Sequence, residues 1–279
     1  MKKTILSRIL PAVLLLTAST GLEAAIKQTG IEQMIMDVWR VQADFHMLTV
    51  MSGSDEYRKQ MEKSIQRGNE TLNSLRSNAD SDAGNALVSD LESSWSNFVE
   101  YARANETAQQ GQPSRYTLQD LRSAGNSMVE QLEGADFADE GEYSDLMSLG
   151  GDLQHIAAEY LRLAAAPGGG VAGSGDRISF EEAVPAFGER LTELEKQYAD
   201  EDAIKRTLGQ VRIRWRFIRD SLVNFSEDAV PFLIHRYSHQ MTDELELAKN
   251  LATSGGAQQP MQGGAPVPGE GQGSNQGGE

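Results

Sequence analysis

Apolar residues recur at every third or fourth position over most of the chain, which is the pattern of amphipathic helices. The clearest stripe in the first half consists of Ile31, Met34, Ile35, Val38, Val41, Phe45 and Leu48. An equivalent stripe in the second half consists of Leu146, Leu149, Leu153, Ile156, Tyr160 and Leu163. Strands are not expected, because no stretch alternates apolar and polar residues between hairpin turns. The pattern therefore predicts an all-α fold from about residue 26 to residue 251.

Turn and cap residues divide this helical region into segments. Ser54, Asp82 and Asp202 stand where new helices would start, since such side chains satisfy free backbone N–H groups or oppose the helix dipole. Pro231 fits the first turn of a helix, where its missing N–H costs nothing. The predicted helices are 28–52, 55–77, 82–107 and 115–133 in the first half, then 143–166, 178–199, 202–227 and 229–252 in the second.

Short sequences recur between the two halves. Ala-Asp-Ser-Asp-Ala at 79–83 returns as Ala-Asp-Glu-Asp-Ala at 199–203, and Trp95 and Trp215 follow them at the same spacing. Further matches pair Gly68 with Gly188, 43–45 with 158–160, and 115–119 with 236–240. This repetition indicates an internal duplication, and it predicts two tandem four-helix up-down bundle modules, 26–135 and 143–252.

The two ends of the chain differ from this helical region. Residues 1–25 have a basic start, a short apolar run and a small-residue exit, which is typical of a secretory signal peptide; an uncleaved N-terminal anchor is the alternative. Residues 253–279 are rich in Gly, Gln and Pro and are expected to be disordered. We therefore expect a protein exported to the periplasm, with no membrane span in the mature chain.

Composition and charge exclude several classes of protein. The formal net charge of −16 would repel nucleic acid and anionic lipid, so neither is expected as a partner. The chain has no cysteine, which removes thiol catalysis, thiolate zinc sites and iron–sulfur clusters. No nucleophile–base constellation is visible, so we expect no enzymatic activity and no cofactor.

A group of arginines surrounds one of the repeated tryptophans. Arg212, Arg216 and Arg219 share a helix face next to Trp215, and guanidinium groups hold planar anions by two-point contacts. These four residues are a candidate binding site for a small anionic ligand. The alternative is that the arginines pair with acidic residues of neighbouring helices and that Trp215 is a core residue, as repeated tryptophans often are.

A second candidate site contains two of the four histidines. His235, His239 and Asp243 follow one another at intervals of one helical turn, which could hold a metal ion if another helix supplied further ligands. The alternative is an ordinary helix face at the boundary of the core. His239 corresponds to Leu118 in the first half, so this pair is not part of the repeated design.

The tryptophan helix and the start of the last helix carry a resemblance to a known family. Trp-Arg-Phe-Ile at 215–218, the helix start at 231–237 and the equivalent Trp95 resemble the extracytoplasmic helical sensor region of PilJ-like type IV pilus chemotaxis transducers. The chain departs from that family in having no second membrane span, no signalling coiled coil and no methylation region. The resemblance implies a sensor-like or binding module.

The expected function is therefore a non-enzymatic, exported helical-bundle protein that binds a protein partner or a small anionic ligand in the periplasm, in a type IV pilus or chemosensory context. A periplasmic metal-handling bundle is the alternative. A structural or chaperone-like envelope protein is a further one.

Overall fold

The structure is a computed structural model, which describes residues 26–104, 115–136, 141, 143–166, 178–225 and 229–254. The expected signal peptide at 1–25 lies outside these described residues. So does the expected disordered tail, except for its first two residues, of which Thr253 still belongs to the last helix.

The described chain is all-α, as the sequence pattern predicts, and contains no strand. The helices are α1 (Gln28–Val50), α2 (Asp55–Asn78), α3 (Asp82–Arg103), α5 (Arg115–Glu133), α6 (Ser144–Ala165), α7 (Phe180–Gln197), α8 (Asp202–Val223) and α9 (Pro231–Thr253). Most bounds agree with the expected ones to within two residues. The exceptions are the ends of α3 and α8, which stop earlier than the expected 107 and 227.

The cap residues explain several of these bounds. Ser81 accepts a hydrogen bond from the backbone N–H of Gly84 at 3.0 Å and so caps α3. Asp202 begins α8, where its charge opposes the helix dipole, and Pro231 occupies the first turn of α9.

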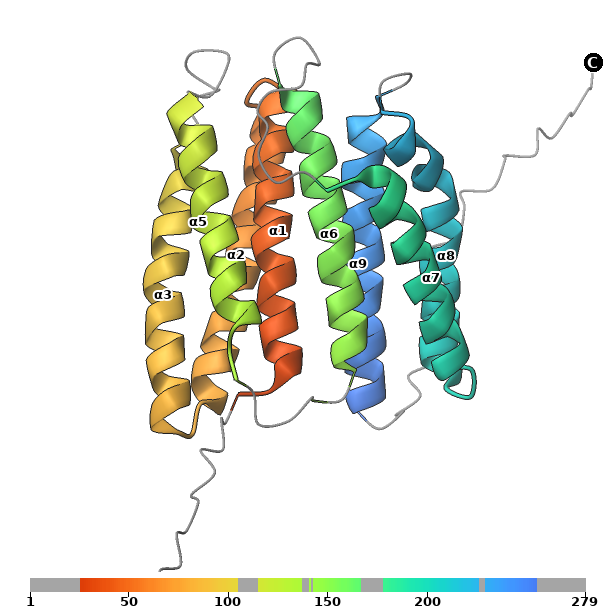
Figure 1. Cartoon of the computed structure of the whole chain (residues 1–279), viewed down its shortest axis with the longest axis horizontal. Helices are drawn as coiled ribbons and strands as arrows, with labels where there is room; N and C mark the ends of the chain where they lie inside the picture. The colour runs from red at the N-terminus through yellow and green to blue at the C-terminus, as the bar shows by residue number, and fades with distance from the viewer. Residues whose placement is uncertain are drawn as a thin grey trace, which may run out of the picture.

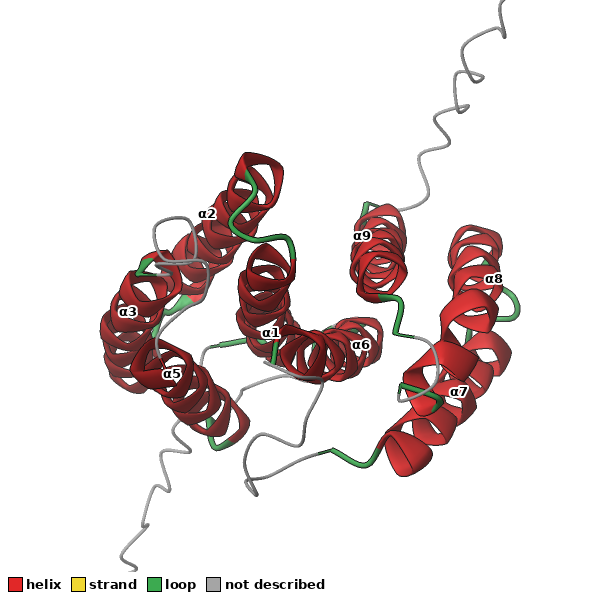
Figure 2. Cartoon of the chain, turned by 90° about the horizontal axis from the view of Figure 1, so that it is seen from above, coloured by secondary structure: helices red, strands yellow, loops and turns green. Residues whose placement is uncertain are grey.

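The helices form two groups that lie side by side (Figures 1 and 2). In the first group α1 contacts α2 and α5, and α3 contacts both of these helices; in the second, α6 contacts α7 and α9, and α8 contacts both of these. We call the groups the first and the second module. Their arrangement fits the expected pair of four-helix modules, while their origin by duplication stays a prediction.

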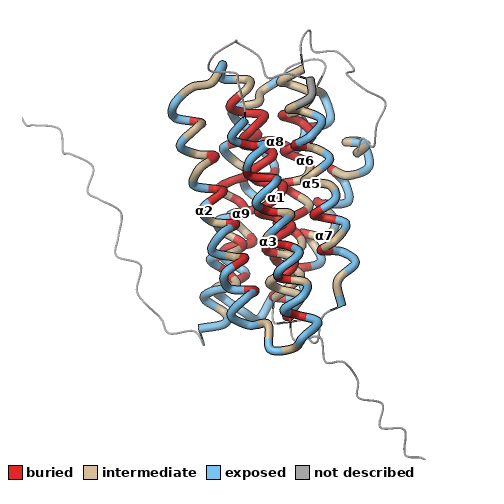
Figure 3. Tube along the Cα trace, turned by 90° about the vertical axis from the view of Figure 1, so that its left-hand side faces the viewer, coloured by how far each residue is buried: buried red, intermediate tan, exposed pale blue. Residues whose placement is uncertain are grey.

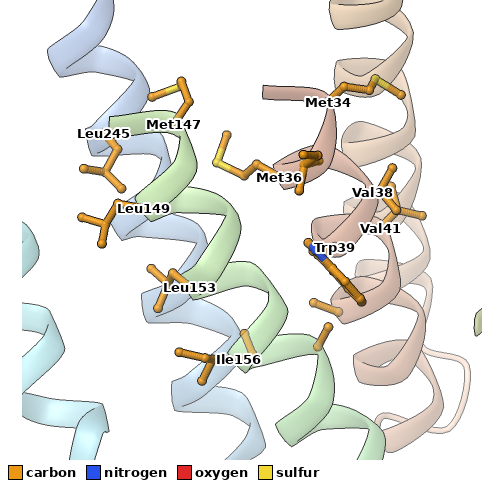
Figure 4. Close-up of a cluster of buried hydrophobic side chains, with 14 of the residues drawn as sticks. Met34, Met36, Val38, Trp39, Val41, Met147, Leu149, Leu153, Ile156 and Leu245 are labelled. Atoms are coloured by element: carbon orange, nitrogen blue, oxygen red, sulfur yellow. The ribbon is translucent and has the colours of Figure 1, made fainter. Parts of the chain in front are cut away.

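Helices α1 and α6 form the centre of the molecule and make its most extensive helix–helix contact. Met36 and Trp39 reach from α1 toward α6, and Trp39 stacks on His155 with ring centroids 3.9 Å apart (Figure 4). On the other side of α6, Leu149 and Ile156 point away from α1, into the rest of the second module. Buried residues accordingly gather along the inner sides of the helices (Figure 3). The modules are thus joined by a continuous core.

The repeated glycine and tryptophan positions form the same contact in both modules. Gly68 of α2 lies against the indole of Trp95 in α3, and Gly188 of α7 lies against Trp215 in α8. Both tryptophans are 3% exposed. A glycine lets the helix backbone approach a large ring closely, because it has no Cβ atom. The sequence repeat therefore corresponds to a repeated packing contact.

Candidate functional site

Helix α1 carries charged and polar residues into the interior. Asp37, Arg40, Asp44 and His46 are all buried, because α1 is surrounded by helices from both modules. Buried charges are costly unless they are paired, so the partners of these residues define the polar interior of the protein. The partners of the first three lie mainly on α2 and α9.

Asp44 lies between the two histidines of α9. Its Oδ1 atom is 2.6 Å from Nε2 of His235 and 3.1 Å from Nε2 of His239. The imidazole rings of the two histidines lie 4.3 Å apart and are tilted by 36°. All three residues are buried. The cluster thus brings one carboxylate from the first module against two imidazoles from the second.

Helix α2 covers this cluster. The Tyr57 ring meets His235 edge-on at 5.6 Å, and the side-chain amide of Gln60 lies 3.3 Å from Nδ1 of His239. A polar partner on the second ring nitrogen fixes the orientation of an imidazole. Three helices therefore hold the two rings in place.

The electrostatics of the cluster keep a negative charge at Asp44. Burial raises the pKa of the Asp44 carboxyl, but the two histidines outweigh this effect and hold its pKa well below the usual range. Burial lowers the pKa of His239 to about 4, although Asp44 acts in the opposite direction. His239 is consequently a neutral imidazole at neutral pH. A neutral imidazole beside a carboxylate is a donor set that suits a metal ion such as zinc.

Asp243 lies in a different group of charges. It pairs with Arg40 at 2.9 Å and with Arg67 of α2 at 3.2 Å, and Arg67 also pairs with Glu246 of α9. Asp37 is 3.6 Å from Arg67. The sequence placed Asp243 with His235 and His239; in the structure the carboxylate beside the histidines is that of Asp44.

The four residues of the arginine candidate site line one open groove between α7 and α8. Arg212 binds Glu195 at 2.7 Å and Thr192 at 2.8 Å, while Trp215 is a core residue packed on Phe187. Acidic residues line the same groove, among them Glu189, Glu193 and Glu195. They would compete with an incoming anion. Arg219 pairs with its neighbour Asp220.

An exposed apolar strip follows the seam between α8 and α9. It consists of the exposed Ile213, Phe217 and Leu233 and the half-buried Tyr237, and we call it the α8–α9 strip. Phe217 is 67% exposed, and its ring stacks parallel to that of Tyr237 at 6.1 Å. Ile213 and Leu233 each lie one helical turn from one of these rings, and both are exposed. The strip lies on the outer surface of the second module.

Sequence reasoning did not identify Asp44 or the α8–α9 strip. For Asp44 there was a signal, since a carboxylate interrupts the apolar stripe of the first helix and returns as Glu159 in the repeat. For the strip, the signal was the presence of the apolar residues Ile213 and Phe217 on the otherwise polar outer face of their helix.

Comparisons with known proteins do not assign the chain to a family. No family model, no curated protein and no solved structure matches the chain. In the part of the chain that the structure describes, no helix has the length and apolar character needed to cross a membrane.

Proposed function

We propose that this chain is a non-enzymatic helical binding protein that recognises a protein partner through the α8–α9 strip. The single observation that carries this proposal is the exposure of an aromatic and aliphatic surface on the second module, with no equivalent among the described residues of the first. A connected apolar surface of this kind marks a contact site more often than a scattered exposed residue does.

The first module serves as an internal reference. By the repeat, Ile213 corresponds to Ser93 and Phe217 to Asn97, and both residues of the first module are polar and exposed. A merely structural need for an apolar residue at these positions would apply to both modules. Tyr237, by contrast, is matched by Tyr116 in the repeat. The apolar residues Ile213 and Phe217 are therefore the part of the strip that is particular to the second module.

Charges around the strip indicate the chemistry of the partner. Arg216 and Arg236 directly precede Phe217 and Tyr237 in the sequence, and both are exposed. Neither has an ion-pair partner among the described residues. In a chain with a net charge of −16, this basic edge favours a partner that combines apolar side chains with acidic ones.

The predicted export signal and the resemblance to PilJ-like sensor regions support a partner in the periplasm, in a pilus or chemosensory system. This part of the proposal rests on the sequence. The buried charges of α1 serve here to join the modules, and they need no catalytic role.

Site-specific photocrosslinking in the native host tests the proposal. A photoreactive residue is placed at position 217 and, as the matched control, at position 97. We expect one discrete adduct with an acidic protein at 217 and none at 97. An adduct containing two copies of this chain, or the same adducts at both positions, would contradict it.

A further inference from the structure

We propose that Asp44, His235 and His239 together bind one divalent transition-metal ion of the zinc class at the interface between α1 and α9. One carboxylate oxygen and one nitrogen from each ring lie within 4.8 Å of one another. Around a tetrahedral zinc ion with bonds of about 2.1 Å, such atoms lie roughly 3.3 Å apart. Small side-chain movements would therefore form the site.

Two buried polar atoms of the cluster have no hydrogen-bond partner among the described residues. They are Oδ2 of Asp44 and Nε2 of His239, and the latter has only its ion-pair contact with Oδ1 of Asp44 at 3.1 Å. Buried polar atoms are nearly always satisfied, because leaving water without a new partner is costly. A metal ion between the side chains would give Nε2 of His239 a coordinate bond in place of the missing hydrogen bond, and a carboxylate that chelates through both oxygens would also engage Oδ2 of Asp44.

The repeat supplies a second buried carboxylate, at the position equivalent to Asp44, whose partners are ordinary salt-bridge residues. Glu159 of α6 corresponds to Asp44 of α1, and both carboxylates are buried. Glu159 pairs with Arg162 at 2.8 Å and with Arg122 of α5 at 3.9 Å. Arginine is permanently charged and balances a carboxylate without any ligand.

Asp44 of the first module forms no ion pair with an arginine among the described residues. Its carboxylate instead faces the imidazoles of His235 and His239, whose ring nitrogens can donate an electron pair to a metal ion. His239 replaces the Leu118 of the first module. The equivalent buried carboxylates thus have different partners: arginines at Glu159 and imidazoles at Asp44, and imidazoles with a carboxylate form a donor set that can bind a metal ion.

Two neighbours affect a cation bound here: the buried guanidinium of Arg40, which opposes positive charge at His239, and the side-chain amide of Gln60. A ring that binds metal through Nε2 carries its proton on Nδ1. In the structure the amide nitrogen of Gln60 lies 3.3 Å from Nδ1 of His239, so metal binding requires the Gln60 amide to turn over and present its oxygen. No fourth carboxylate or imidazole of the described residues joins the cluster. Three protein ligands leave one position of a tetrahedral ion for water or for a small ligand.

Metal binding by the wild-type chain is the first test. The full chain, expressed without a polyhistidine tag and treated with EDTA, is titrated with zinc chloride and, separately, with magnesium chloride. We expect saturable binding of one zinc ion per chain, two imidazole ligands in the X-ray absorption spectrum, and no response to magnesium. An absence of saturable zinc binding, or a spectrum with no imidazole ligand, would overturn the proposal.

Three variants locate the site. Asp44→Asn and His239→Leu each remove a ligand, and Glu159→Gln is the matched control at the equivalent buried carboxylate. We expect zinc affinity to fall at least about 100-fold in the first two, because even outer-shell changes cost 10–100-fold, and to stay unchanged in the control. Asp44→Asn keeps the shape of the side chain, so it remains informative even if His239→Leu misfolds. An unchanged zinc affinity in Asp44→Asn would refute the site. No strip residue takes part, so this test and the crosslinking test fail independently.

Discussion

Gly68 of α2 lies so close to the indole of Trp95 that a Cβ atom at position 68 would overlap the ring. The equivalent Gly188 is less crowded, since a Cβ atom there would lie 3.5 Å from Nε1 of Trp215, an ordinary contact. The same repeated pair is thus tightly packed in the first module and more loosely packed in the second.

This difference predicts opposite effects of one substitution. Gly68→Ala should lower the free energy of unfolding by about 1–2 kcal/mol, because overpacking outweighs the gain in helix propensity. Gly188→Ala should raise it by about 0.5–1 kcal/mol, because only the propensity gain applies. Urea denaturation of both variants measures these changes. Equal effects at the two positions would show that the packing difference is not real.

The buried Asp37 predicts a pH dependence of stability. Burial raises its pKa to about 7, although Thr71, Arg67 and Arg40 lower it, and Glu246 acts with burial. The unfolded carboxyl has a pKa of about 3.9. Between these two values the folded state binds more protons than the unfolded state, so stability falls as the pH rises from about 4 to about 7.

Asp37→Asn should remove this contribution. Relative to wild type, the variant should be more stable at pH 8 than at pH 4.5, and urea denaturation at the two pH values measures the difference. The Thr71 hydroxyl, 2.6 Å from the carboxylate, can donate equally to the amide oxygen of asparagine. If the difference in free energy of unfolding between the variant and wild type does not change with pH, the raised pKa of Asp37 is contradicted.

The two neighbouring aromatic residues Trp215 and Phe217 should differ in their contribution to stability. Trp215→Ala removes a core side chain and should cost about 3–5 kcal/mol. Phe217→Asn introduces the residue of the first module at an exposed position and should change stability by no more than about 0.5 kcal/mol. Thermal unfolding of both variants provides the comparison. A large loss in Phe217→Asn would mean that the strip is structural.

Removal of metal should affect stability through Asp44. If zinc binds the folded chain alone, a concentration of 100 times the Kd stabilises it by about 2.7 kcal/mol. EDTA should therefore lower the Tm of the zinc-loaded wild type and of Glu159→Gln, but not that of Asp44→Asn. An equal EDTA effect in all three would place the metal elsewhere.

The helical architecture could be predicted from the sequence because its signals are local. The apolar period indicates the buried face of each helix, and Asp82, Asp202 and Pro231 mark helix starts through their charge or fixed backbone angle. The tryptophan repeat indicated equivalent core positions. These features depend on residues close together in the chain.

The candidate metal site could be predicted only in part, because one ligand comes from a distant helix. His235 and His239 are one turn apart and do face the same neighbour. Asp243 follows eight residues after His235, and eight residues turn the side-chain direction by about 80°, toward Arg40 and Arg67 instead. Asp44 reaches the histidines only through the packing of α1 against α9, which no local spacing reveals.

The central claim of a partner-binding strip is tested most directly by the affinity of the purified chain for the protein captured at position 217. Isothermal calorimetry compares wild type with Phe217→Asn, and Asn97→Ala serves as the control on the first module. An exposed aromatic residue at the centre of an interface contributes at least about 2 kcal/mol, which corresponds to roughly 30-fold in Kd. We predict a loss of this size in Phe217→Asn and none in the control. An unchanged Kd in Phe217→Asn would contradict the account.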